Sequence, residues 1–398
     1  MNIDPSVRQI EAEMKTWRRH LHANPELGFE EHDTALFVAE KLRSWQLPVV
    51  AGVGRTGLVA TLQGNGGSGP SIGIRADMDA LPMTEETALP YRSRFPGRMH
   101  ACGHDGHTVM LLAAARALAS SRDFFGTVHF IFQPAEEGLG GARAMLADGL
   151  FDRFPCDEVY ALHNSERRLG EVVIYDQVVA AGADRFTIAI HGRGGHAAAP
   201  HLAVDPIPIA ARLLLAIEAL PGRHIDAASP AVVTVSSFKA GEAFNTIPEV
   251  AILGGTVRCF DSAIRNKLEA AIRQLAEAHA GMYGARAEIV YDSPFLPTVN
   301  TPQQAGHLEE AAADVVGRGN ILRNPPPEMG SEDFCFMLEQ RPGCYFLLGQ
   351  GDAAHTAVAH DTRYDFNDAI LPIGASIWTS LVRRRLATAG GTTAQPRT

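Results

Sequence analysis

The sequence has no apolar run long enough to span a membrane, for which about 20 consecutive apolar residues are needed. Residues 1–15 also lack the apolar segment of a secretory signal peptide. Cysteine is scarce, and its five residues are irregularly spaced and odd in number, which argues against a disulfide framework. Together these absences predict a cytoplasmic protein without a membrane partner.

Positive charge is not in excess either, since 45 acidic residues outnumber 35 lysines and arginines and give a net charge of −10. A chain with this excess of negative charge cannot offset the repulsion of nucleic-acid phosphates over a large interface. We therefore expect no nucleic-acid partner. A small anionic substrate is still compatible, because one arginine can dominate a pocket. Four cysteines, at positions 156, 259, 335 and 344, lie in apolar or mixed stretches and are predicted to be small buried side chains.

The length of 398 residues exceeds what one ordinary hydrophobic core holds, which predicts two domains. Outside its middle part the chain alternates between apolar strands and helical patterns. The alternation predicts helices over 7–22, 34–44, 107–120, 140–148 and 370–386, and strands over 57–62, 71–75, 126–132, 158–162 and 343–348. Because these strands are largely apolar, we expect a sheet covered on both faces, an α/β architecture.

The order of strand and helix patterns changes in the middle of the chain. The pattern there predicts a strand, a helix, two strands, a helix and a strand, over 184–191, 206–220, 231–240, 250–259, 262–281 and 285–291. This β-α-β-β-α-β order is typical of a ferredoxin-like domain. We therefore expect an inserted domain over 181–294, serving dimerisation or as a lid, within a discontinuous domain of 1–180 and 295–398. The small, polar tail 387–398 is expected to be disordered.

Polar side chains follow the predicted strands of the discontinuous domain. They are Asp77 and Asp79, the segment 100–107, the segment 133–137, His163 with Asn164, and His360 with Asp361. In open α/β sheets the ligand site lies at the carboxyl ends of the strands, so these segments should meet in one crevice. Any one of them alone would be unremarkable, but together they predict a metal site.

The types of side chain narrow the choice of metal. Imidazole, thiolate and carboxylate suit zinc and its neighbours, whereas calcium requires oxygen ligands. The candidate ligands are Cys102, His104, Glu137, His163 and His360. Because they are too many for a single ion, we expect two divalent ions per subunit, drawn from Zn, Mn, Ni or Co. Such a pair would lower the pKa of a bridging water and polarise a carbonyl group.

The adjacent Glu136 and Glu137 offer one ligand and one general base. On an extended segment their side chains would point apart. These residues alone leave open which glutamate takes which role. Asp79 is a candidate to hold a ligating imidazole in one tautomer, although a plain turn-forming aspartate is an alternative.

Four blocks of the sequence carry most of these polar residues: RADMDALP (75–82), HACGHDGH (100–107), QPAEE (133–137) and GSEDF (330–334). In this order they resemble the M20 metallopeptidase family and its amidohydrolase branch. The resemblance implies that Cys102 bridges two metals, with His104 and His163 on one and Glu137 and His360 on the other. It also implies that Glu136 is the general base and Asp79 an orienting residue. Asp77 stands where related peptidases carry a metal-binding histidine, so His104 is expected to replace that ligand.

The resemblance extends to the inserted domain through the segments 192–196 (GRGGH) and 244–248 (FNTIP). It implies that Asn245 and Arg258 bind the carboxylate of the substrate, a group that an arginine fork fits well, and that Gly330 is a further substrate-binding residue. It also implies that His196 reaches the neighbouring subunit's metal site and donates to the oxyanion. Without the resemblance, Arg258 would be read as a surface arginine and His196 as a loop-packing histidine.

From these residues we expect a homodimeric or tetrameric hydrolase that converts N-acyl amino acids of the hippurate type into a carboxylic acid and a free amino acid. Deacetylation of an N-acetyl amino acid and dipeptide hydrolysis are the alternatives. A non-catalytic, metal-stabilised binding protein is disfavoured, because it would have no use for both glutamates. Where many relatives carry Trp and Pro after His163–Asn164, this chain has SERRL (165–169), which leaves the acyl preference open.

Overall fold

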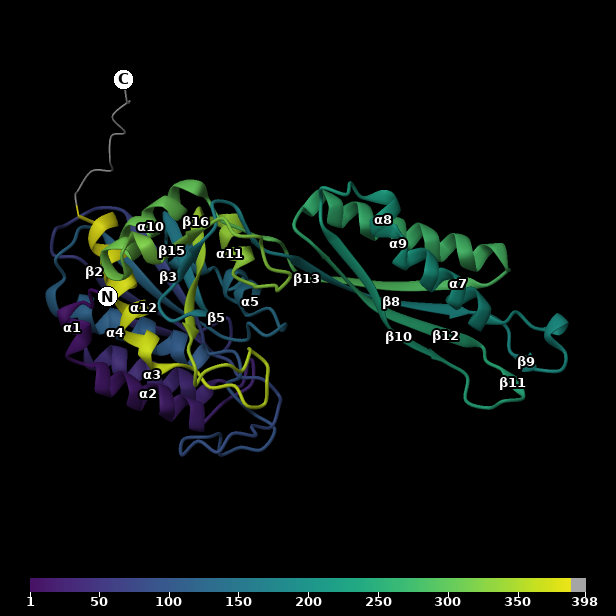
Figure 1. Ribbon diagram of the computed structural model, residues 1–398, viewed down its shortest axis with the longest axis horizontal. Helices are drawn as coiled ribbons and strands as arrows, with labels where there is room; N and C mark the ends of the chain where they lie inside the picture. The colour runs from purple at the N-terminus through teal and green to yellow at the C-terminus, as the bar shows by residue number, and fades with distance from the viewer. Residues whose placement is uncertain (388–398) are drawn as a thin grey trace, which may run out of the picture. The chain divides into compact units, whose positions relative to one another are not determined.

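A computed structural model describes residues 1–387 of the chain, which form two compact units (Figure 1). Unit 1 comprises Met1–Val179, Val299–Pro326 and the chain from Asp333 onward, and unit 2 comprises Ala180–Thr298 and Pro327–Glu332. The tail that we expected to be disordered lies, apart from Ala387, outside the described residues.

The units differ from the expected domain boundaries in three places. Residues 180, 295–298 and 327–332 group with unit 2 rather than with the discontinuous domain. The last difference has a simple cause in the backbone: the amide of Ala181 lies 3.0 Å from the carbonyl oxygens of both Glu328 and Gly330. Hydrogen bonding therefore joins this short segment to the residue that precedes the first long strand of unit 2.

Unit 1 contains a mixed sheet of eight strands. In spatial order these are β1 (Val49–Val53), β2 (Gly57–Gln63), β4 (Thr127–Gln133), β3 (Ser71–Asp77), β5 (Glu158–Arg168), β16 (Gly343–Gly351), β6 (Val172–Ile174) and β15 (Ile321–Arg323). The four central strands β4, β3, β5 and β16 are parallel. The pairs β1–β2, β2–β4 and β16–β6 are antiparallel.

Helices cover this sheet on both faces. One face carries α2 (Glu11–Ala23), α3 (His32–Ser44), α4 (His104–Ser121), α10 (Pro302–Val316) and α12 (Leu371–Arg385), with α1 (Pro5–Arg8) beside α4 and α12. The other face carries α5 (Gly141–Ala147) and α11 (Cys335–Gln340), and α6 (Leu150–Arg153) contacts α5 (Figure 1). The expected α/β architecture is confirmed.

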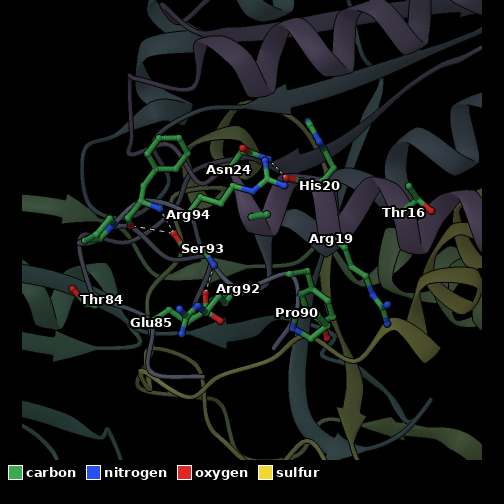
Figure 2. Close-up of a pocket in the computed structure, with 14 residues that line it drawn as sticks. Thr16, Arg19, His20, Asn24, Thr84, Glu85, Pro90, Arg92, Ser93 and Arg94 are labelled. Atoms are coloured by element: carbon green, nitrogen blue, oxygen red, sulfur yellow. Dashed lines mark hydrogen bonds between the residues drawn. The ribbon is translucent and has the colours of Figure 1, made fainter. Parts of the chain in front are cut away.

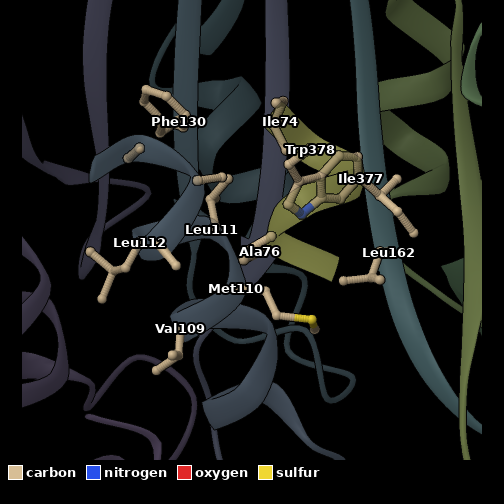
Figure 3. Packing of buried hydrophobic residues seen from close by; sticks show 14 of the residues in the cluster. Ile74, Ala76, Val109, Met110, Leu111, Leu112, Phe130, Leu162, Ile377 and Trp378 are labelled. Carbon is tan, nitrogen blue, oxygen red and sulfur yellow. The ribbon is translucent and has the colours of Figure 1, made fainter. Parts of the chain in front are cut away.

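The core of unit 1 lies between the sheet and the layer of α4 and α12. Ile74 and Ala76 of β3 project from the same face of their strand toward the fully buried α4 residues 109–112 and toward Trp378 (Figure 3). The alternate residues Gly73, Arg75 and Asp77 project from the opposite face of that strand. Burying each large aliphatic side chain contributes about 1.5–3 kcal/mol. This packing fixes the strand ends that carry the polar residues.

Unit 2 contains an antiparallel sheet of four strands in the order β10 (Ala231–Ala240), β12 (Val250–Cys259), β8 (Gly182–His191) and β13 (Arg286–Phe295). Helices α7 (Pro206–Glu218) and α9 (Ser262–Met282) pack on one face, and α8 (Leu220–His224) follows α7 (Figure 1). The chain order is the expected β-α-β-β-α-β. A small separate ladder pairs β9 (Gly195–His196) with β11 (Thr246–Ile247).

The sequence reading missed the short or weakly patterned elements. These are β1, β6, β15, α6, α10, α11 and the short strands β7 (Val178–Ala180) and β14 (Thr298–Val299). The four cysteines expected to be buried are buried, and all five thiols are free. Among the described residues, no helix combines the length and apolarity that crossing a bilayer requires.

Candidate metal centre

The central parallel strands bring the predicted segments to one edge of the sheet. Asp77 is the last residue of β3 and Gln133 the last residue of β4, and the neighbouring strands run in the same direction. The next helix, α4, begins at His104, three residues earlier than expected. His163 lies inside β5 rather than after its end, because this strand continues to Arg168 and pairs His163 with Leu347 of β16.

Two groups of potential metal ligands share one residue. Cys102, His104 and His163 form the first group, and Cys102, Glu137 and His360 form the second. Within each group the ligand atoms all lie within 4.8 Å of one another. The Cys102 Sγ lies 3.3 Å from His163 Nε2, and His360 Nε2 lies 3.3 Å from Glu137 Oε1. The structure thus brings together all five candidate ligands, with the thiol common to both groups.

Asp79 connects the two groups. Its Oδ1 lies 3.2 Å from His104 Nδ1, and its Oδ2 accepts a hydrogen bond of 3.0 Å from the backbone amide of Glu137. Its own carbonyl oxygen is also 3.0 Å from His104 Nδ1. These contacts leave His104 Nε2 as the nitrogen that faces Cys102 and its neighbours.

Two buried polar atoms of the cluster lack hydrogen bonds within the described residues. They are His104 Nε2 and Glu137 Oε1, the latter close to His360 without a hydrogen bond. A buried polar atom without a partner costs about 1–3 kcal/mol. Sulfur, nitrogen and oxygen donors arranged in this way fit a pair of zinc-like divalent ions, which would satisfy both atoms.

Glu136 and Glu137 lie in a turn, which corrects the expectation of an extended segment. Residues 136–139 form the turn, and Ala135 before it has a positive φ of 52°. As a result the two carboxylates do not point apart: each has an oxygen within 4.8 Å of the other and of His104. The amide of Ala135 donates to Glu31 Oε1 at 2.8 Å, which anchors the turn.

The sequence reading did not single out His107 and Asn164 as functional, although both lie directly behind the ligands. His107 Nδ1 is 2.6 Å from Asp77 Oδ1, and its Nε2 is 2.7 Å from Asn164 Oδ1. Asp77 also accepts a hydrogen bond of 2.8 Å from Arg75. Asp77, His104 and His107 make a third possible ligand group, but both nitrogens of His107 are already engaged. Both residues lay in polar segments that follow the predicted strands, His107 in the motif 100–107 and Asn164 beside His163, but the sequence pattern assigned neither of them a role.

Local backbone geometry places Cys102 and His360. Gly103, between Cys102 and His104, has φ +94°, and a Cβ there would lie 2.2 Å from Asn164 Oδ1. His360 adopts φ +68°, and its amide donates to the carbonyl of Ala101 at 2.7 Å. A non-glycine residue in this region is strained and is held by its surroundings.

The electrostatics of the cluster favour a cation. The neighbouring Cys102 and Glu137 raise the pKa of His360 to about 10. Burial lowers the pKa of His104, yet the negative charges of Asp77 and Cys102 outweigh it and leave that pKa well above its ordinary value. Burial lowers the pKa of His163 to about 3, so this imidazole is neutral and able to bind a metal.

The remaining predicted residues lie in unit 2. His196 of β9 pairs with Thr246 of β11, so it lies beside Asn245, and both side chains are exposed. Arg258 of β12 is half-buried and donates a hydrogen bond to the hydroxyl of Ser331, the neighbour of Gly330. The structure therefore forms two pairs, His196 with Asn245 and Arg258 with the segment of Gly330.

Known proteins resemble this chain over nearly its whole length. Residues 73–384 match Peptidase family M20/M25/M40. A hippurate hydrolase of Campylobacter jejuni is 39% identical over 97% of this chain and 100% of that protein. The IAA-amino acid hydrolase ILR1-like 5 of Arabidopsis thaliana is 37% identical over 93% of this chain and 86% of that one.

A solved structure agrees in fold as well. It is that of Bacillus subtilis YXEP, a dinuclear metal binding peptidase from the M20 family, with a TM-score of 0.83 and 30% identity over 96% of this chain and 99% of that chain. The chain therefore belongs to peptidase family M20/M25/M40, in its amidohydrolase branch, and is a hydrolase of amide bonds.

Proposed function

We propose that this amidohydrolase cleaves N-acyl amino acids of the hippurate type in the cytoplasm, with two divalent metal ions in each subunit. The observation that carries the proposal is the sharing of Cys102 by two ligand groups. Cys102 would be shared by the two ions, His104 and His163 would hold one of them, and Glu137 and His360 would hold the other. The native metal is zinc, manganese, nickel or cobalt, all of which accept this donor set.

When bound, the two ions supply hydroxide at neutral pH and polarise the carbonyl of the substrate. Glu136 is the general base: it takes the proton of the attacking water and returns it to the leaving nitrogen. Its support is positional, because Glu136 is 6% exposed and has an oxygen within 4.8 Å of ligand atoms of His104 and Glu137. Asp79 keeps His104 Nε2 directed at the metal by accepting from Nδ1.

The substrate's carboxylate is bound by unit 2. Arg258 supplies a planar fork that matches the carboxylate, and Asn245 and Gly330 complete the binding. The hydrogen bond from Arg258 to Ser331 supports this role, because it holds the guanidinium beside the segment that contains Gly330. The relatives support the substrate class, since one is a hippurate hydrolase and another an IAA-amino acid hydrolase.

The active form is a homodimer, or a tetramer built from it, and His196 acts on the partner's substrate. Strand β10 is at an edge of the sheet of unit 2, and Val232 and Phe238 on it are 44% and 41% exposed. An exposed, partly apolar edge of this kind is a natural surface for pairing two copies. The imidazole of His196 then donates to the oxyanion that forms in the partner's site.

A panel of substrates on metal-reconstituted protein tests the proposal. Hippurate and related N-acyl amino acids should be cleaved faster than N-acetyl amino acids and dipeptides, and removing the metal should abolish cleavage and lower the melting temperature. Faster cleavage of N-acetyl substrates would favour the deacetylase alternative. Cleavage only of substrates with a free amino terminus would favour a dipeptidase. An active preparation without divalent metal would disprove the two-metal site, and metal binding without cleavage of any substrate would favour a binding protein.

A further inference from the structure

A second hollow of unit 1, of about 860 Å³, lies between α2 and the segment 84–96. None of the described residues that line it belongs to the ligand groups of the metal centre. Four of its lining residues are basic: Arg19, His20, Arg92 and Arg94. Figure 2 shows the three arginines on different sides of the pocket. This concentration of positive charge contrasts with the net charge of −10 of the whole chain.

The one acidic residue among the described residues of the wall is buried and already has partners. The Glu85 side chain is 2% exposed, and its Oε2 lies 3.4 Å from the Nε2 of buried His22 and accepts from the amide of Ser93 at 2.6 Å. Its other oxygen accepts from the hydroxyl of Thr87. Both oxygens of Glu85 are therefore engaged away from Arg92 and Arg94.

Two of the arginines are free to bind a ligand. Arg92 and Arg94 are exposed, and within residues 1–387 no carboxylate pairs with either of them. Arg19 differs from them, because its guanidinium forms an ion pair of 3.0 Å with the carboxylate of Asp368. Burial lowers the pKa of His20, and the positive charges of Arg94 and Lys41 lower it further. The lowered pKa of His20 therefore comes mainly from burial, and the positive charge of Arg94 in the same wall adds to it.

The other part of the wall is apolar and rigid. Ala23, Pro90, Tyr91, Phe95 and Pro96 form it. The ring of Tyr91 is fixed by the guanidinium groups of Arg18 and Arg19, which lie 4.6 and 4.5 Å from its centroid, and by a hydrogen bond of 2.9 Å from its hydroxyl to Asp365. An aromatic wall beside free guanidinium groups suits a molecule with an apolar body and a carboxylate.

We propose that this pocket is a second ligand site, which binds a small organic carboxylate with an apolar body. Arg92 and Arg94 hold the carboxylate, and Tyr91, Phe95 and the two prolines contact the body. The site is independent of the proposed hydrolysis, because it uses none of the residues assigned to that reaction.

Protection of the arginines from phenylglyoxal, followed residue by residue with peptide mass spectrometry of the metal-loaded protein, tests the proposal. Benzoate at ten times its Kd should slow modification of Arg92 and Arg94 about tenfold. Arg43 of α3, exposed and outside the pocket, is the internal control and should react at an unchanged rate. Benzamide has the same body without the charge and inorganic phosphate has charge without the body, so both should protect weakly.

Each other outcome overturns the proposal in a recognisable way. Equal protection by phosphate would show a general anion site, and equal protection by benzamide an apolar site without charge recognition. Protection of Arg43 as well, or of no arginine, would show that no specific site exists.

Variants provide a second, independent readout. By equilibrium dialysis, the double variant Arg92→Ala/Arg94→Ala should lose one class of benzoate sites, with affinity reduced about tenfold or more. The matched variant Arg43→Ala should retain it. Hydrolysis kinetics at low substrate concentration should be unchanged in both variants, which separates this site from binding of benzoate at the metal centre. Unchanged benzoate stoichiometry and affinity in a folded double variant would overturn the proposal.

Discussion

Two adjacent carboxylates of one turn are proposed to do different work, and single substitutions separate them. Glu136→Gln should lower kcat by about 10²–10⁴-fold, the range for loss of a general base, and leave the metal content nearly intact. Glu137→Gln removes a ligand and should lower the metal occupancy first. Kinetics and elemental analysis of both variants check the prediction, and each variant is the other's control because the two oxygens lie within 4.8 Å. The reverse pattern would exchange their roles.

Arg258 is proposed to bind the substrate rather than to take part in the reaction itself. Arg258→Ala should raise KM more than it lowers kcat, because the substrate's carboxylate is bound both before and during the reaction. A substrate whose carboxylate is replaced by a neutral amide should lose little further affinity in this variant. Arg185→Ala is a suitable control, since Arg185 is an exposed arginine of the neighbouring strand β8. If the acid and the amide were affected equally in variant and wild type, Arg258 would not touch the carboxylate.

The ends of helices and strands position the residues of the site, and the start of α4 shows this most clearly. Gly103 and Gly67 both have φ +94°, but a Cβ at Gly103 would lie 2.2 Å from Asn164 Oδ1, whereas a Cβ at Gly67 meets nothing within 4 Å. Gly67→Ala should therefore cost only the backbone strain, about 1–2 kcal/mol. Gly103→Ala should cost more and also reduce metal occupancy, because Cys102 and His104 flank it. Denaturant unfolding and elemental analysis compare the two, and equal costs with full occupancy would contradict this.

The contact between α2 and α4 includes a buried ion pair whose strength depends on pH. His22 Nδ1 lies 2.9 Å from Asp105 Oδ2. Burial opposes the charge of His22, but Asp105 and Glu85 outweigh it and raise its pKa from 6.5 to about 9. A raised pKa stabilises the fold fully below about pH 6.5, and that contribution is lost as the pH rises toward 9.

The variant His22→Gln should therefore be less stable than the wild type, and the difference should shrink between pH 6.5 and 9. The shift corresponds to a change of about 3 kcal/mol in the free energy of unfolding. Denaturant unfolding at several pH values measures this difference. His32→Gln, at an exposed position of α3, should show no such dependence. A difference for His22→Gln that stayed constant with pH would show that the pair is not charged.

The elements with a continuous apolar pattern could be predicted from the sequence. Strands β3, β4 and β16 are buried almost throughout, so composition alone marked them. Strands β6 and β15 have three residues each, which is too few for any period. Pairing makes them strands, since β15 pairs with β6 and β6 also pairs with β16. α10 was missed because polar residues interrupt its pattern, whereas its buried side follows from contact with α12.

The candidate site was predictable to the extent that it depends on strand ends. Five side chains from four segments came together near the edge where the parallel strands β3 and β4 end, although His163 lies inside β5 rather than at its end. The contacts behind them were not predictable, because Asn164 reaches His107 through side-chain geometry that no spacing encodes. The turn at Glu136 was missed for a similar reason: it depends on the positive φ of Ala135 and on the distant Glu31.

His196 is proposed to act on the site of the partner subunit, and mixing two inactive variants tests this role. Glu136→Ala and His196→Ala subunits, allowed to exchange, give dimers of which half are mixed. If His196 acts on the partner's site, each mixed dimer has one intact site, and about a quarter of the wild-type activity should return. If it acts within its own subunit, every site keeps a defect. No recovery after verified exchange would therefore exclude action between subunits.

The position of β16 in the sheet also governs how the chain can fold during synthesis. β16 lies between β5 and β6, yet it is translated after the whole stretch Ala180–Thr298 of unit 2. On the ribosome, the sheet of unit 2 can close while the larger sheet still has a gap at its centre. His360 emerges later still, after Cys102 and Glu137 have long been synthesised. The second group of potential ligands is therefore complete only once the chain has been made as far as His360.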